Sequence, residues 1–133
     1  MKTEITGDDW LALLSEGFAV ELLGNELTVQ TVKGGVVDAR LQRSYLVRRA
    51  AFADRAATAL RDVTSELDAE DAARRLLDHD RAHGTDRGAV PAAERRWDID
   101  PCAYAHQEHA VAVRDEYDQR EQHDQHDQPD AGI

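Results

Sequence analysis

Cysteine, lysine and long apolar runs are scarce in this sequence of 133 residues. Its single cysteine, Cys102, excludes an internal disulfide and therefore a secreted disulfide scaffold. No segment approaches the roughly 18 consecutive apolar residues of a membrane-spanning helix, and the N-terminal stretch lacks the apolar core of a signal peptide. We therefore expect a cytoplasmic protein, or a component of a virus particle assembled there, with no membrane partner.

Large apolar residues also become rare toward the C-terminus, and no leucine follows Leu77. A chain of this length supports one compact hydrophobic core. We expect a core domain over residues 1–83, a linker over 84–100, an amphiphilic helix over 101–121, and a disordered acidic, His-rich tail over 122–133.

Acidic residues outnumber basic ones by 27 to 16, which gives a formal net charge of −11. The excess is uneven, because residues 1–50 carry 7 acids and 6 bases whereas residues 91–133 carry 11 acids and 4 bases. Two lysines against fourteen arginines fit a halophilic protein, and the composition of a GC-rich genome explains them as well. The acidic third either keeps the protein soluble or imitates the phosphates of DNA, as viral inhibitor proteins do.

Residue patterns in the first third predict an α+β fold. A short helix from Trp10 to Leu14, capped by Thr6, should end near Gly17. Partly alternating, β-branched runs separated by Gly24-Asn25 and Gly34-Gly35 then predict a three-stranded antiparallel meander. The expected strands are Phe18–Leu22, Leu27–Val32 and Val36–Leu41.

Helical spacing returns after the expected sheet. Ser44 is a candidate N-cap for a long helix that carries apolar residues from Tyr45 to Val63. A further helix over 69–83 should stop at Gly84, and a last helix should begin at Pro101.

The six histidines form three pairs at helical spacings, namely His79 with His83, His106 with His109, and His123 with His126. Two imidazoles on one helix face suit a zinc ion, and Cys102, His106 and His109 are the best candidate ligands. No CxxC or HExxH motif accompanies them, so solvated histidines are the favoured interpretation.

The only basic cluster spans the third expected strand and the start of the long helix, and consists of Arg40, Arg43, Arg48, Arg49 and Arg55. Such a cluster can contact nucleic-acid phosphates. Because the chain is strongly acidic and acids follow from Asp54, a salt-bridged face or a docking patch for an acidic partner is favoured.

No nucleophile elbow and no phosphate-binding loop occurs in the sequence, so we expect no enzymatic activity, cofactor or small-molecule substrate. We interpret the chain as a non-catalytic interaction module, such as a virion or assembly component, an adaptor or an inhibitor, whose partner is another protein or a second copy. Its acidic C-terminal arm is expected to become ordered on that partner. The alternatives are a nucleic-acid-binding regulator and a small metal-binding protein. The expected partner-binding residues are Arg43, Arg48, Arg49, Trp97, Tyr104 and Tyr117.

Overall fold

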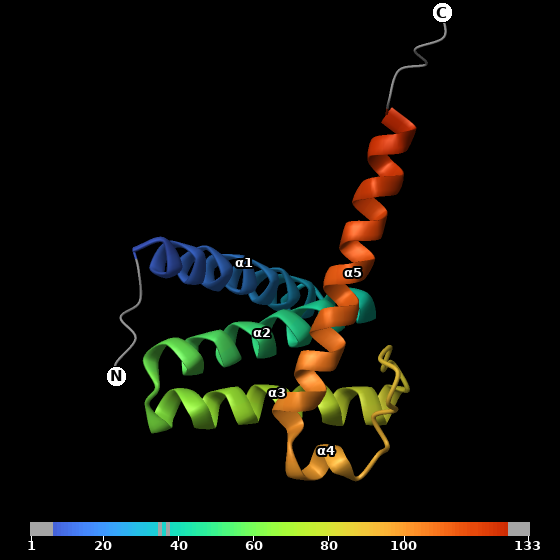
Figure 1. The fold of residues 1–133 in the computed structure, drawn as a ribbon. Helices are drawn as coiled ribbons and strands as arrows, with labels where there is room; N and C mark the ends of the chain where they lie inside the picture. Colours follow the sequence, from blue (N-terminus) through green and yellow to red (C-terminus); the bar gives the residue numbers. More distant parts are fainter. Residues whose placement is uncertain (1–6, 35, 37, 128–133) are drawn as a thin grey trace, which may run out of the picture.

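The structure, a computed structural model, describes residues 7–34, 36 and 38–127, with side chains to Gln122. Within these residues, four long helices and one short helix follow one another (Figure 1). They are α1 (Gly7–Val32), α2 (Ala39–Leu60), α3 (Val63–His83), α4 (Arg96–Ile99) and α5 (Pro101–Asp127). No strand occurs in the described part of the chain, so the prediction of an α+β fold with a three-stranded meander is wrong.

The segment expected to hold the first two strands belongs to α1, a single helix of 26 residues. Two of its glycines lie against aromatic rings of α2 instead of forming turns. A Cβ at Gly17 would lie 3.2 Å from the Phe52 ring, and one at Gly24 would lie 3.3 Å from the Tyr45 ring. The two glycines are seven residues apart on α1, and the two aromatic residues are seven apart on α2, so the antiparallel helices stay in contact over two turns. Tertiary packing therefore overrides the low helix propensity of glycine.

Threonines near the end of α1 are also accommodated within the helix. The hydroxyls of Thr28 and Thr31 donate hydrogen bonds to the carbonyls of Gly24 and Leu27, at 3.0 and 2.9 Å. Each hydroxyl thus finds an acceptor within its own helix, so these β-branched residues do not require a strand. Gly34, with φ of 71°, lies in the connection to α2, so a turn forms there, but it joins two helices.

Aspartates cap α2 and α3 earlier than expected. The Asp38 carboxylate accepts hydrogen bonds from the amides of Arg40 and Leu41, so α2 begins at Ala39 and Ser44 lies inside it. Asp62 caps α3 through the amide of Ser65 at 2.7 Å. The predicted stop at Gly84 is confirmed, with φ of 63°. The proposed cap Thr6 lies outside the described residues.

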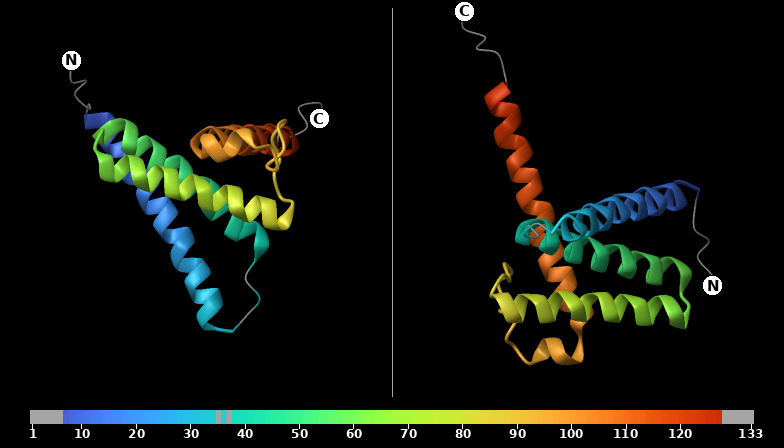
Figure 2. Two further views of the ribbon diagram at one scale, coloured as in Figure 1. Left: turned by 90° about the horizontal axis from the view of Figure 1, so that it is seen from below. Right: turned by 180° about the vertical axis from the view of Figure 1, so that it is seen from behind.

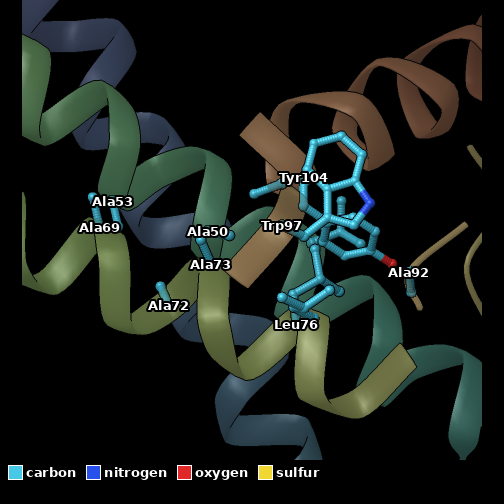
Figure 3. Packing of buried hydrophobic residues seen from close by; sticks show 12 residues of the cluster. Ala50, Ala53, Ala69, Ala72, Ala73, Leu76, Ala92, Trp97 and Tyr104 are labelled. Atoms are coloured by element: carbon cyan, nitrogen blue, oxygen red, sulfur yellow. The ribbon is translucent and has the colours of Figure 1, made fainter. Parts of the chain in front are cut away.

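The centre of the core is the seam between α2 and α3, where small side chains let the helices approach closely. Ala50 and Ala53 on α2 face Ala69 and Ala73 on α3 (Figure 3). Leu76 and Leu77 are fully buried at the wider end of the seam. Alanines fill most of this interface, so a few large residues must close it from outside.

Those large residues come from the C-terminal part of the chain. Tyr104 on α5 is fully buried, and its ring centroid lies 5.5 Å from that of Trp97 in an edge-to-face arrangement. The Trp97 indole donates a hydrogen bond to the carbonyl of Pro91 at 3.0 Å. The segment expected to be a linker therefore supplies core residues, among them Ala92 and Trp97.

Helix α5 begins at Pro101 as predicted and continues to Asp127, six residues beyond the expected end. Its first turns pack on α2 and α3, and its second half stands clear of the other helices in each view (Figure 2). Residues 122–127, expected to be disordered, are helical, whereas residues 128–133 lie outside the described part.

Two truncations test which part of α5 belongs to the fold. Deleting residues 119–133 should leave the melting temperature nearly unchanged, because the described side chains it removes are exposed. Deleting residues 101–133 should abolish cooperative thermal unfolding followed by circular dichroism, since it removes Tyr104 and Glu108 from the core. A cooperative transition in the shorter chain would contradict this account of the core.

Candidate functional site

A buried polar cluster joins α2, α3 and α5. The Arg43 guanidinium on α2 binds both oxygens of Asp80 on α3, with Nε and Nη2 each 2.9 Å away. Nη2 also lies 2.7 Å from Oε1 of Glu108 on α5. Both carboxylates are almost completely buried, at 0% and 1% exposed, so a single guanidinium is shared by two buried acids.

Other donors complete the cluster. The hydroxyls of Tyr104 and Thr85 donate to the two oxygens of Asp80. Glu108 accepts the backbone amides of Arg87 and Gly88, at 2.6 and 2.8 Å, and so fixes the loop between α3 and α4. A Cβ at Gly88 would overlap the Gln107 amide and the Glu108 carboxylate, so this close approach requires glycine.

The donors determine the ionisation of Asp80. Burial opposes its negative charge, but hydrogen bonds from Arg43, Thr85 and Tyr104 outweigh burial and hold its pKa below the ordinary value. Burial and the hydrogen bond to Asp80 raise the pKa of Tyr104, so its hydroxyl remains a donor. The cluster is therefore ionised at Arg43 and Asp80 and closed on itself, which suits a structural connection between helices.

The predicted basic cluster is divided by the fold. Arg43 is in the buried cluster, Arg49 binds Asp68 on α3 at 2.7 and 2.9 Å, and Arg55 forms an ion pair with Glu16 on α1. Arg40 and Arg48 are exposed. Three of the five guanidiniums are thus paired with acids of the same chain, which favours the salt-bridged interpretation over a phosphate-binding face.

The predicted metal ligands have other environments. His106 Nε2 lies 2.7 Å from a carboxylate oxygen of Asp54, while burial lowers the pKa of His109 and raises the pKa of the Cys102 thiol. Among the residues with described side chains, no three His, Cys, Asp or Glu groups come together as metal ligands. The side chains of His123 and His126 lie outside the described residues.

Of the three aromatic residues expected at a partner surface, two are buried and one is exposed. Trp97 and Tyr104 are core residues, at 7% and 0% exposed. Tyr117 is exposed on the part of α5 that stands clear of the other helices. An open apolar surface lies elsewhere, on α1 and α2.

Helices α1 and α2 form an open apolar groove of about 750 Å³. Trp10, Leu14 and Phe18 line it from α1, and Phe52 and Leu60 line it from α2. Among the described residues, only two charged side chains border it, Glu21 on α1 and Arg49 on α2. The polar side chains at its walls are Asn25, Thr28 and Tyr45.

An exposed apolar row on α1 continues the groove outward. Of the 26 residues of α1, only Val20 is buried. Seven large apolar residues are exposed along its length, and at 3.6 residues per turn all of them except Trp10 lie within an arc of about 80°. This apolar row consists of Leu11, Leu14, Phe18, Leu22, Val29 and Val32.

The sequence carried a signal for this row that the strand interpretation obscured. Leu11, Phe18, Asn25 and Val32 recur at intervals of seven residues, and Leu22 and Val29 repeat the same interval. A seven-residue apolar repeat is typical of a helix that packs against another helix. Gly24-Asn25 interrupts the repeat with residues that are typical of a hairpin turn. The short alternating runs on either side were therefore interpreted as strands.

Comparison of the chain with protein-family models, with curated proteins and with solved structures found no match. None of the helices among the described residues is long and apolar enough to cross a membrane.

Asp80→Asn tests the buried cluster. The substitution weakens the bidentate pair and leaves Arg43 facing Glu108 alone, so the free energy of unfolding at pH 7 should fall by about 3–5 kcal/mol. Asp78→Asn is the matched control, because Asp78 lies two residues away on α3 and is exposed. Urea unfolding of both variants checks the difference, and equal stabilities would contradict a structural role for Asp80.

The difference in stability between the wild type and Asp80→Asn should depend on pH. The pKa of folded Asp80 is lowered from 3.8, so its stabilisation is present above that pH and is lost as the pH falls through the folded pKa. The wild type should therefore lose more stability than Asp80→Asn on acidification below about pH 4. Parallel curves would show that Asp80 contributes nothing through its charge.

Proposed function

We propose that the chain is a non-catalytic interaction module that accepts an amphipathic helix in the groove between α1 and α2. The observation that carries this proposal is the apolar row on α1, which runs the length of the helix and joins the groove at Leu14 and Phe18. Helices that dock in a groove insert apolar anchors at intervals of three, four and seven residues.

The extent of the exposed surface supports an interface. The apolar row, Trp10 and Leu60 together expose on the order of 900 Å² if a fully exposed large side chain presents roughly 200 Å². The largest apolar patch on a typical monomer is about 300–600 Å². A stable interface covers about 800 Å² on each partner, so the patch suffices for one.

The attachment of α1 mainly to a single neighbouring helix points the same way. It packs mainly on α2, with aromatic rings against glycines and with the Glu16–Arg55 ion pair. An apolar helix face that stays in contact with water contributes no free energy of burial to the fold. A partner helix in the groove would bury that face and fix α1 on the core.

Selection from a displayed library of amphipathic helical peptides tests the proposal. Peptides should bind the immobilised protein, and Phe18→Asp should weaken them about 100-fold, because it places a charge at the centre of the apolar row. Val113→Asp on α5 is the matched control, since Val113 is 51% exposed and Phe18 is 64% exposed. Peptides that bind Phe18→Asp as well as they bind the wild type would contradict a docking site in the groove.

A further inference from the structure

The residues that line the groove indicate its occupant. We infer that the groove is filled by α1 of a second copy of this chain, so that two α1–α2 hairpins form a two-fold symmetric dimer. The inference rests on the proposed function, because it names the helix that the groove accepts. Three properties of the surface support it: its paired charges, its apolar area and its lack of a cover among the described residues.

The charges of the groove are self-complementary. Glu21 lies on the α1 wall and Arg49 on the α2 wall. The contacts of Gly17 with Phe52 and of Gly24 with Tyr45 place these two residues at nearly the same level of the hairpin. In a two-fold interface each contact occurs twice with its members exchanged, so Glu21 of each copy can face Arg49 of the other.

Both groups have capacity for such a contact. Glu21 is exposed and forms no hydrogen bond or ion pair with another described residue. Arg49 uses Nη2 for Asp68, and its buried Nη1 has no acceptor in the described part of the chain. Because Nη1 is buried, a carboxylate of a second copy would reach it only after the Arg49 side chain, which is 30% exposed, shifts toward the groove.

The helices are charged in a complementary manner as well. Helix α1 carries five carboxylates and no basic residue, whereas α2 carries five arginines and one aspartate. Arg43, Arg49 and Arg55 already pair with acids of the same chain. The acidic side chains that α1 of a second copy brings would therefore meet mainly the exposed Arg40 and Arg48 while its apolar row enters the groove. The excess of acid in residues 91–133 lies mostly on α5.

The apolar area matches a symmetric interface. About 900 Å² on each copy reaches the roughly 800 Å² per partner of a standard interface. Asn25 lies within the apolar row, and a single polar residue in such a seam selects register and partner. The second half of α5 cannot serve as the cover, because Tyr117 is its one large apolar side chain between Arg114 and Gln122.

Sedimentation equilibrium of the full chain under reducing conditions tests the inference. The wild type should be a dimer at micromolar concentration. The double variant Leu14→Asp/Phe18→Asp should raise the dimer dissociation constant at least roughly 100-fold, with its helix content preserved in circular dichroism. Val113→Asp should remain dimeric. A wild type that stays monomeric, or a double variant that stays dimeric, would overturn the inference.

Thiol cross-linking supplies a second measurement that keeps the groove intact apart from one side chain. Phe18→Cys in a Cys102→Ser background should form cross-linked dimers with a short thiol-specific reagent, because Phe18 lies near the middle of the groove. Val113→Cys in the same background should not. Equal cross-linking at both positions would overturn the inference even if the double variant fails to fold.

These results also separate the two proposals. If the wild type is monomeric but helical peptides bind in a manner sensitive to Phe18→Asp, the second copy is excluded and the docking groove remains. If neither a dimer nor groove-dependent peptides are found, both proposals are wrong.

Discussion

The Arg43 guanidinium is the point on which the arrangement of helices depends. It binds Asp80 on α3 and Glu108 on α5 at once, and Glu108 in turn holds the loop at Arg87 and Gly88. The seam between α2 and α3 is made largely of alanines, which specify close approach but not direction. Charged hydrogen bonds of fixed geometry supply that direction, because the buried carboxylates are stable only with their donors in place.

The packing of the inner helices leaves much of α1 exposed. Helices α2, α3 and the first half of α5 bury their own small core, whereas α1 lies outside the polar cluster and packs mainly on α2. Most of the large apolar side chains of the first helix are therefore exposed, including Phe18 and Leu22 at 64% and 69%. The fold is held by the inner helices, and the apolar row on the outer helix remains exposed.

Local signals predicted the ends of helices better than they predicted the fold. Gly84 and Pro101 terminate and begin helices as their chemistry requires, and Asp100 accepts the amide of Ala103 at the start of α5. The strand prediction failed because Gly24 and Asn25 are turn residues in isolation, and only the Tyr45 ring, 21 residues away, makes Gly24 favourable inside a helix. The same limit applies to the sites. The sequence placed Arg43 in a cluster of arginines. It gave no sign of the buried acids that bind Arg43, because Asp80 and Glu108 lie 37 and 65 residues further along the chain.

The central claim is that residues 7–32 form one continuous helix whose outer face carries the apolar row. Backbone NMR of the full chain measures this most directly. Helical Cα chemical shifts and sequential amide–amide contacts that continue through Gly24 and Asn25 would agree with the structure. Strand shifts over Phe18–Leu22 and Leu27–Val32, with a break between them, would contradict the fold, the groove and both proposals built on it.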